Sequence, residues 1–283
     1  MDMEIGNLLE SFEIGLAQQI KAWSQKSSTG LTRISHHLCL APKANRVRPF
    51  LIYQFGKLLK VDPFSIFYIA LAAELTHTAS LMHDDVLDMA YLRRGRKTVN
   101  AKWGNEKAVL GGDFLFVQAL KEVQLHSPHN LESLLKTITE MVDGVYQELE
   151  WRKNLDISVS QWREMALKKT GALFQWCGEA VERQSMVEKS SFLLPETYNA
   201  FGKAALHFGL AFQMADDLKD FLDSKSGKKK YQDLQNGNPN LCILLGIQKE
   251  PTLKKEIPSL WLIKSSQEKC EYIHNRLHSL QVF

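Results

Sequence analysis

Two acidic clusters with the same internal spacing are the residues of this sequence best suited to chemistry. The first lies in "HDDVLD" at residues 83–88, and the second lies in "ADDLKD" at residues 215–220. In each cluster the carboxylates occupy positions i, i+1 and i+4, and each cluster is embedded in apolar sequence. The candidate catalytic carboxylates are Asp84, Asp85, Asp88, Asp216, Asp217 and Asp220.

This spacing suits metal binding on a helix. Positions i and i+4 lie on one face about a turn apart, so each cluster can direct two carboxylates at one point. Without a cation such carboxylates would raise one another's pKa values and cost stability. Mg²⁺ favours hard oxygen ligands and commonly takes one or two carboxylates together with substrate phosphates. Two acidic faces opposed across a helical bundle would therefore hold a diphosphate between metal ions.

Two other interpretations of the acidic clusters stay open at this point. Each cluster could be a solvated helix surface or an acidic first turn, although two clusters with identical spacing in apolar sequence disfavour this. An EF-hand is also disfavoured, because neither cluster has the D-x-D-x-D-G loop pattern.

Basic residues lie close to these clusters in the sequence and would complement a diphosphate. Arginine suits bidentate phosphate contacts, and lysine acts as a compact point charge. Taken singly, each of these residues would be interpreted as a solvated surface charge, so only their combination is informative. They are Arg93 and Arg94 in "LRRG", Arg46 and Arg48 in "NRVRPF", and Lys168 and Lys169 in "LKKTGALF".

Helical periodicity dominates the segments that carry these residues. Apolar and small residues recur at three- and four-residue steps in 63–92, 130–153, 160–182 and 195–223. We find no convincing strand alternation, no Gly-rich phosphate loop, no repeat and no linker long enough to divide the chain. The sequence therefore predicts one all-α domain over residues 1–283.

Composition excludes several classes of protein. The 283 residues carry a net charge of +3, which does not suggest nucleic-acid binding. The four cysteines lie far apart without zinc-site spacing, which favours free thiols in a reducing cytoplasm. No run of about 18 apolar residues predicts a transmembrane segment, and an acidic N-terminal region argues against a secretory signal. We therefore expect a cytoplasmic protein.

At the quoted motifs the sequence resembles the trans-isoprenyl (polyprenyl) diphosphate synthases of the long-chain type. The resemblance runs from about residue 43 to 245 and includes "RVRP", "HTASLMHDDVLDMAYLRRGRKT", "GGDFLF", "KTGALF", "FQMADD" and "GKKKYQDL". It implies an isoprenoid-synthase helical bundle around a deep central cavity, usually a homodimer. It also implies Mg²⁺ as cofactor, with three ions per site when diphosphate is bound.

The resemblance assigns roles to individual residues. Asp84, Asp88 and Asp216 would bind Mg²⁺, with Asp85, Asp217 and Asp220 completing the two motifs. Arg93 would contact the allylic diphosphate, and Arg94 the diphosphate of isopentenyl diphosphate. Arg48 and His77 would bind isopentenyl diphosphate, and Lys169, Thr170, Gln213 and Lys228 would bind the allylic diphosphate, with Lys169 also counted as catalytic. Asn45 and Arg46 complete the expected substrate-binding residues.

Two positions depart from the family's pattern. Asn45 replaces a lysine before the first Arg-Pro, and Asn238 replaces a lysine after the glycine of the late loop. Each change removes a positive charge from an expected diphosphate pocket. We still expect activity, with weaker binding of isopentenyl diphosphate.

The expected reaction is ionisation followed by alkylation. Mg²⁺ and basic side chains would stabilise the departing diphosphate, and the allylic cation would be attacked by the double bond of isopentenyl diphosphate. The primer would be farnesyl or geranylgeranyl diphosphate, and the product is expected to pass to the membrane.

Small residues beside the first cluster bear on product length. Ser80, Thr76 and Ala72 step back by four from Asp84, and Ala79 lies beside them. Short-chain members typically have an aromatic residue at 79 or 80, so the absence of one favours a C30 or longer product for a quinone side chain. The alternative is that small residues simply let two helices approach closely.

Three other functions stay open as alternatives. A weakly active or non-catalytic subunit that sets chain length in a heteromer is the main alternative, and Asn45 and Asn238 favour it slightly. A class I terpene cyclase is disfavoured because the second motif is "DDLKD" and "RRG" is present. A short-chain (C15 or C20) synthase is disfavoured by the small residues.

Overall fold

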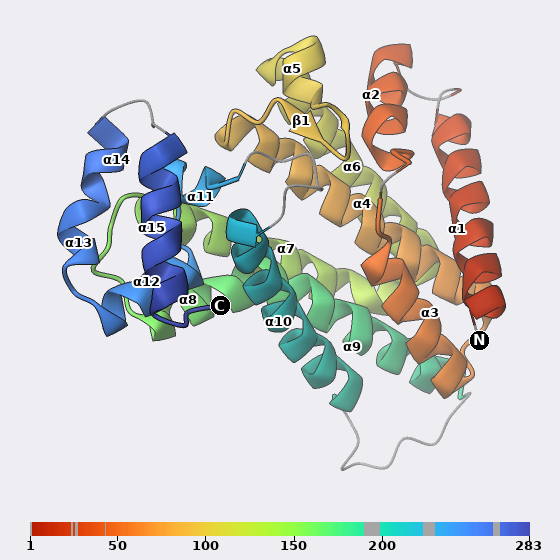
Figure 1. The fold of residues 1–283 in the computed structure, drawn as a ribbon. Helices are drawn as coiled ribbons and strands as arrows, with labels where there is room; N and C mark the ends of the chain where they lie inside the picture. The colour runs from red at the N-terminus through yellow and green to blue at the C-terminus, as the bar shows by residue number, and fades with distance from the viewer. Residues whose placement is uncertain are drawn as a thin grey trace. The chain divides into compact units, whose positions relative to one another are not determined.

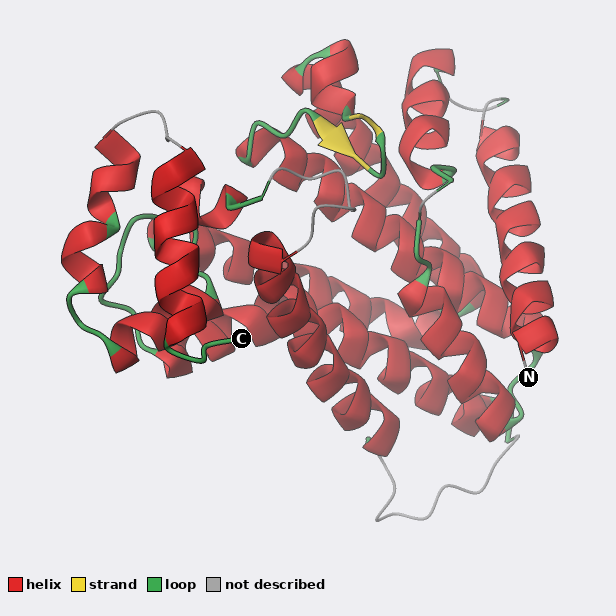
Figure 2. Ribbon diagram, viewed as in Figure 1, coloured by secondary structure: helices red, strands yellow, loops and turns green. Residues whose placement is uncertain are grey.

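The computed structural model describes residues 2–23, 25, 28–42, 44–189, 199–222, 230–262 and 267–283. Within these ranges the chain is helical apart from one short hairpin (Figures 1 and 2), so the all-α prediction is confirmed. The hairpin pairs β1 (Leu92–Arg93) with β2 (Arg96–Lys97), and it was not predicted because two-residue strands show no alternation. The chain forms two compact units, each described by itself below. That they make a single domain remains a prediction.

Unit 1 comprises residues 1–138 and 173–205. Its elements up to the start of α7 follow one another along the chain, and α9 joins them from later in the sequence. Their bounds are α1 (Asp2–Trp23), α2 (Thr29–Cys39), α3 (Val47–Leu59), α4 (Pro63–Leu87), α5 (Val99–Trp103), α6 (Asn105–His126), the 3₁₀ turn η1 (Pro128–Asn130), the start of α7 (Leu131–Glu150) and nearly all of α9 (Ala172–Val187).

The central helix of unit 1 is α4, which packs mainly against α6 and α3. It begins with Asp62 as N-cap, whose carboxylate accepts the backbone N–H of Phe64 at 3.0 Å, and with Pro63 in the first turn, where its missing N–H costs nothing. By length and composition α4 is the one helix among the described residues that could cross a membrane, but 61% of its most apolar stretch is buried in the protein. Because of that burial, we interpret α4 as the core helix of unit 1.

Glycine allows α4 and α6 to approach closely. A Cβ atom added to Gly112 of α6 would lie 2.3 Å from Nε2 of His83 on α4. No real Cβ contact is that short, so a larger residue at position 112 would displace the His83 ring. The "GGD" motif therefore leaves room for the ring that precedes Asp84.

Unit 2 comprises residues 139–172 and 206–283. It holds the end of α7 and most of α10, followed by shorter helices that pack around two small apolar cores. Beyond α7 its elements are α8 (Val159–Ala166), the π-helical turn η2 (Leu167–Gly171), α10 (Ala200–Leu222), α11 (Gln232–Asn236), α12 (Leu241–Lys249), α13 (Leu253–Glu256), α14 (Pro258–Leu262) and α15 (Gln267–Ser279).

All four cysteines are buried free thiols, which leads to a first prediction. Burial raises the pKa of the Cys39, Cys177 and Cys242 thiols to about 12, so almost no reactive thiolate exists at neutral pH. We expect the folded protein to react with a thiol-specific disulfide reagent at the rate of unfolding, and the denatured protein to react at once with all four. Rapid labelling of the native protein would contradict this packing.

Candidate active site

The first acidic cluster lies at the C-terminal end of α4 in unit 1. Asp84 is in the last turn and Asp88 is the C-cap residue, and both are partly exposed. Asp85 differs, because it is fully buried and its Oδ1 accepts a hydrogen bond from Nε of Arg93 at 2.6 Å. Burial raises the pKa of Asp85 to about 6, and the Arg93 guanidinium opposes that rise. The pair at i and i+4, Asp84 and Asp88, is therefore the more exposed part of the cluster.

The two arginines that follow are placed by the tight turn of the hairpin. Arg94 and Gly95 join β1 to β2 with φ values of 51° and 73°, the left-handed backbone that two-residue hairpin turns require. The turn returns Arg93 to Asp85 and brings a side-chain nitrogen of Arg94 within 3.4 Å of the Leu38 carbonyl. Local turn geometry thus brings both cations to the first acidic cluster and the end of α2.

Glu74 was missed by the sequence reasoning and connects the predicted arginines. It is 1% exposed on α4 and lies within 3.8 Å of Nη2 of Arg94. Its Oε1 also accepts a hydrogen bond from Nη1 of Arg46. A buried carboxylate with two arginines is stabilised only while those partners remain. Glu74 therefore holds Arg94 beside the first cluster.

Arg46 was predicted to bind substrate, but in the structure its guanidinium forms hydrogen bonds with other residues of unit 1. It is 4% exposed, and its Nε donates to Glu13 Oε1 at 2.6 Å. It also donates to the Cys39 carbonyl and to Glu74. Asn45, beside it, is exposed. Arg46 therefore links α1 to α4 through its ion pairs with Glu13 and Glu74.

Arg48 and His77, unlike Arg46, form no ion pair with a carboxylate among the residues that the structure describes. The Arg48 guanidinium lies 4.3 Å from the ring centre of Phe174, and its buried Nε has no hydrogen-bond partner within the described ranges. Burial, followed by the nearby charge of Arg48, holds the pKa of His77 well below its usual value. His77 is thus neutral at physiological pH, while Arg48 retains a donor for an anionic ligand.

The residues proposed to set product length are tightly packed. Ala72, Thr76 and Ala79 are fully buried in α4. Ser80 is partly exposed, and its hydroxyl donates to the His77 carbonyl at 2.9 Å.

The second acidic cluster lies near the end of α10 in unit 2. Asp216 is exposed, whereas Asp217 is 2% exposed. Asp217 accepts the backbone N–H of Leu241 at 2.7 Å and a side-chain hydrogen bond from Gln213 at 2.8 Å. Burial, and then the charge of Asp233, raises the pKa of Asp217 well above its usual value. Asp216 is therefore the accessible carboxylate, and Asp217 anchors the start of α12.

Asp220 and Asp233 build the segment that follows α10. Asp220 accepts the backbone N–H groups of Gln232 at 2.9 Å and Asp233 at 3.2 Å, and so caps α11. Asp233, which the sequence reasoning missed, accepts hydrogen bonds from Asn240 at 3.0 Å and Asn238 at 3.3 Å.

Asn238, which replaces an expected lysine, is held by hydrogen bonds to other residues of unit 2. It is 8% exposed, and its side-chain oxygen accepts a hydrogen bond from Nε of Arg152 at 2.9 Å. Lys228, by contrast, lies outside the described residues.

Lys169 and Thr170 lie in the π-helical turn η2. A Cβ on Gly144 of α7 would lie 2.4 Å from the backbone nitrogen of Lys169, so the two segments need glycine to pack this closely. The Thr170 hydroxyl donates to the Gln213 side chain at 2.6 Å, and the Lys169 ammonium pairs with Glu148. The π turn thus joins these predicted residues to α10, a common use of π turns at functional sites.

No three His, Cys, Asp or Glu side chains form a closed metal-binding group within the described ranges. Asp84 and Asp88 nevertheless provide the one or two carboxylates that Mg²⁺ uses when phosphates supply further ligands. Asp216 provides the corresponding exposed carboxylate in unit 2.

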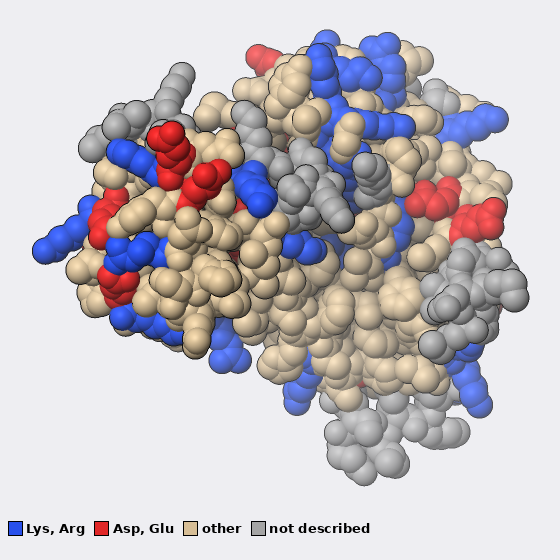
Figure 3. All heavy atoms as spheres, in the orientation of Figure 1, with Lys and Arg blue, Asp and Glu red and all other residues tan. Residues whose placement is uncertain are grey.

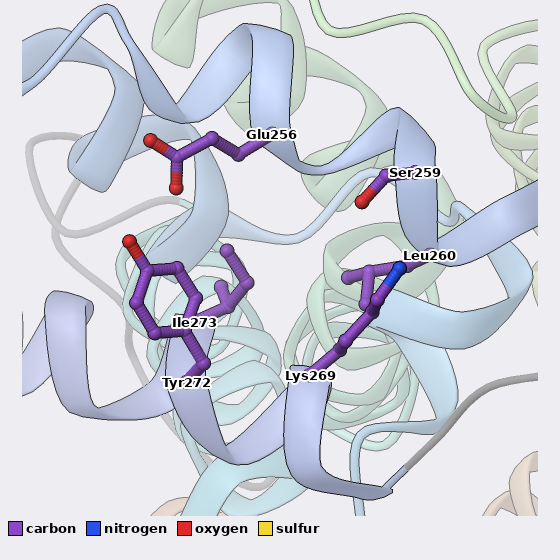
Figure 4. A pocket seen from close by; sticks show the side chains of 6 residues that line it. All are labelled: Glu256, Ser259, Leu260, Lys269, Tyr272 and Ile273. Carbon is purple, nitrogen blue, oxygen red and sulfur yellow. The ribbon is translucent and has the colours of Figure 1, made fainter.

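A separate groove of about 310 Å³ lies in unit 2 between α13, α14 and α15 (Figure 4). Glu256, Ser259 and Tyr272 supply polar groups at its edge, and Leu260 and Ile273 supply apolar ones. None of the predicted site residues lines it.

Comparisons with known proteins agree with these motifs. A sequence model described as polyprenyl synthetase matches residues 29–277. Component 2 of heptaprenyl diphosphate synthase from Geobacillus stearothermophilus is 31% identical over 72% of this chain, and chloroplastic solanesyl diphosphate synthase 2 from Arabidopsis thaliana is 35% identical over 72%. The matches span 63% and 48% of those two relatives. A geranylgeranyl diphosphate synthase from Saccharolobus solfataricus is 27% identical over 84% of this chain and 73% of its own length.

Solved structures share the fold. A polyprenyl synthase from Caulobacter crescentus, complexed with calcium and isoprenyl diphosphate, superposes with a TM-score of 0.86 at 28% identity, covering 98% of this chain and 84% of its own. Heptaprenyl diphosphate synthase from Staphylococcus aureus gives a TM-score of 0.82 at 28% identity, with coverages of 97% and 84%.

Proposed function

The chain belongs to the polyprenyl synthetase family, and from this premise we propose that it is an active trans-prenyltransferase. It would join isopentenyl diphosphate head-to-tail to an allylic diphosphate, with farnesyl or geranylgeranyl diphosphate as primer. The observation that carries the proposal is the end of α4, where partly exposed Asp84 and Asp88 adjoin the turn that carries Arg93 and Arg94. Carboxylates for a divalent cation and arginines for phosphate are the groups that a diphosphate substrate requires.

We propose Mg²⁺ as the cofactor, held by Asp84, Asp88 and Asp216, with three ions per site when diphosphate is present. When bound, the ions would stabilise the negative charge of the departing diphosphate. Asp85 and Asp217 would act as positioning residues, since both are buried and hydrogen-bonded to their own units. Calcium in the Caulobacter relative supports a divalent metal for the family.

Basic residues would bind the diphosphates. Arg93 and Arg94 would supply fixed positive charge, and Arg48 would donate its unpaired Nε to isopentenyl diphosphate. Lys169 and Thr170 would bind the allylic diphosphate from the π turn. Arg46 would position Glu74 instead of contacting substrate, because four of its five N–H donors bind Glu13, Glu74 and Cys39.

Product length is proposed to be C30 or longer. The support is the row of small side chains before the first cluster and the long-chain names of relatives such as the solanesyl and heptaprenyl synthases. A geranylgeranyl synthase is also a relative, so the length itself must be measured.

Replacing Ala79 with Phe should shorten the product by two or more isoprene units, because in the long-chain proposal the growing chain passes α4 at Ala79 and an aromatic ring would stop it there. The measurement is chromatography of products from labelled isopentenyl diphosphate. Ala73 is also fully buried in α4, so Ala73→Phe is the matched packing control. An unchanged product distribution in a folded, active Ala79→Phe variant would contradict the long-chain proposal.

A subunit that acts only in a heteromer is the second candidate, favoured by the component 2 name of one relative and by Asn45. Incubating the purified chain with Mg²⁺, labelled isopentenyl diphosphate and an allylic primer distinguishes the active synthase from the heteromer subunit. Product from the chain alone supports the synthase proposal. Product only after a second subunit is added would support the heteromer.

We propose a homodimer in the cytoplasm. Leu110 and Val117 are 59% and 58% exposed on α6, seven residues apart and so on one helix face, and Val109 adjoins them. A second copy would cover this apolar stripe. The cytoplasmic location is supported by the four free thiols.

The stripe on α6 gives a direct test of assembly. Leu110→Glu/Val117→Glu should convert the dimer to a monomer, since it would place charges in an apolar contact. Light scattering after size exclusion measures the mass. Ala204→Glu/Gln248→Glu, which adds the same two charges at exposed positions of other helices, is the control. A wild-type monomer would contradict the proposal.

A further inference from the structure

The segment that joins α4 to the hairpin exposes apolar side chains within four positions. Met89 is 86% exposed, Tyr91 58% and Leu92 45%. Met89 has a left-handed backbone, with φ 49°, that a residue with a side chain adopts uncommonly. Single exposed apolar residues are ordinary, whereas a contiguous group of them is typical of a surface that contacts a protein, a ligand or a membrane.

Positive charge surrounds these side chains. Residues 89–107 contain six Lys or Arg residues and a single acidic residue, Glu106. Arg96, Lys97 and Lys102 are exposed, as is Arg33 of the neighbouring helix α2. Figure 3 shows Lys and Arg side chains gathered over α5 and the hairpin at the top of the view.

Contacts join the cations and the aromatic rings into one surface. The Lys97 ammonium lies 5.3 Å from the Tyr91 ring centre, and His37 hydrogen-bonds the Lys97 carbonyl at 2.8 Å. His37 in turn contacts Trp103, whose ring centre lies 4.4 Å from the Lys102 ammonium. Arg33 lies over the same ring. We call this surface the hairpin patch: Arg33, Met89, Tyr91, Leu92, Arg96, Lys97, Lys102 and Trp103.

We propose that the hairpin patch binds the surface of a membrane that contains anionic lipid. Apolar and aromatic side chains enter the boundary between headgroups and acyl chains, and lysine and arginine bind the phosphates. The net positive charge selects an anionic surface over a neutral one. Every residue of the patch lies in unit 1, so the surface is defined within one compact unit.

The patch also adjoins the proposed chemistry, and this part of the inference rests on the proposed function. Arg93, between Leu92 and the turn, holds Asp85 of the first cluster. A polyprenyl product has a long apolar tail, which partitions from water into a bilayer. Binding of the hairpin patch to a membrane would release that tail close to the lipid.

The test is sedimentation with lipid vesicles in the absence of any substrate, so a failed result leaves the prenyltransferase proposal untouched. The wild-type chain should bind vesicles of phosphatidylcholine with about 30% phosphatidylglycerol, and should bind pure phosphatidylcholine far more weakly. Raising the salt from about 0.05 M to about 0.5 M should weaken binding, because the charges are exposed.

Two variants examine the two kinds of contact. Lys97→Gln/Lys102→Gln should bind roughly thirtyfold more weakly, at about fivefold for each charge removed. Met89→Ser/Leu92→Ser should weaken binding at both salt concentrations. The matched control is Lys203→Gln/Lys255→Gln, which removes the same charge at exposed positions elsewhere and should bind as the wild type does. Circular dichroism confirms that each variant is folded.

Three results would overturn the proposal. They are equal binding to anionic and neutral vesicles, equal loss in the control, and no binding to either vesicle. A halved mass of Met89→Ser/Leu92→Ser in light scattering would also overturn it, since the patch would then lie between two copies of the chain.

Discussion

Replacing Asp84 with Asn is expected to lower kcat by about 10²–10³-fold, the cost of removing one group that stabilises developing charge in an active site. Asp84 is a partly exposed member of the i, i+4 pair, so its carboxylate is available to Mg²⁺ and is poorly replaced by an amide. The fold should be unaffected, since the side chain lies at the end of α4 and outside the core. Initial rates with saturating primer and isopentenyl diphosphate measure the effect.

Asp143→Asn provides the control for Asp84→Asn. The Asp143 side chain is 64% exposed on α7, so it tests for a general effect of losing one acidic charge. It should retain the wild-type rate. An Asp84→Asn variant with unchanged kcat and unchanged dependence on Mg²⁺ would remove the first cluster from the proposed metal site.

Replacing Glu74 with Gln is expected to lower the free energy of unfolding by about 3–5 kcal/mol, because Arg46 and Arg94 would lose their buried counter-charge. The variant should also raise KM for isopentenyl diphosphate about tenfold or more without changing KM for the allylic primer, because Arg94 would no longer be held in place. Urea denaturation measures the first effect, and two-substrate kinetics on the folded enzyme measure the second.

Glu13→Gln is the matched comparison, because Glu13 binds the same Arg46 but its side chain is 41% exposed. The Glu13 carboxylate is partly solvated, whereas that of Glu74 is buried, so this variant should lose clearly less stability than Glu74→Gln. Equal stability losses in both variants would contradict the importance assigned to burial. Equal changes in both KM values for Glu74→Gln would show a merely structural role.

Local spacing was enough to predict the helices and the acidic clusters. The three- and four-residue periodicity of 63–92 predicted α4, and the i, i+4 relation of Asp84 and Asp88 depends only on that helix. The same reasoning counted Asp85 and Asp217 among the candidate catalytic carboxylates without showing that both are buried. Their burial and partners come from tertiary packing, which spacing does not contain.

Long-range partners explain the residues that were missed. Glu74 sits in the apolar run "LAAELTHTAS", and its one sequence signal was a lone acid among residues of a buried helix. Its partner Arg46 is 28 residues away, so the pairing appears only in the fold. Asp233 likewise binds Asn240 across a turn. The π turn at Lys169 depends on close packing against Gly144, which no local pattern encodes.

The central claim is that the exposed carboxylates of both clusters hold the divalent ions on which the diphosphate binds. The most direct measurement is anomalous diffraction at the manganese edge, from crystals grown with Mn²⁺ and a non-ionisable thio analogue of the allylic diphosphate. We predict manganese peaks at Asp84 and Asp88 of unit 1 and a manganese peak at Asp216 of unit 2 when the analogue is bound. A bound analogue with no metal on Asp216, or with none on Asp84 and Asp88, would contradict the claim.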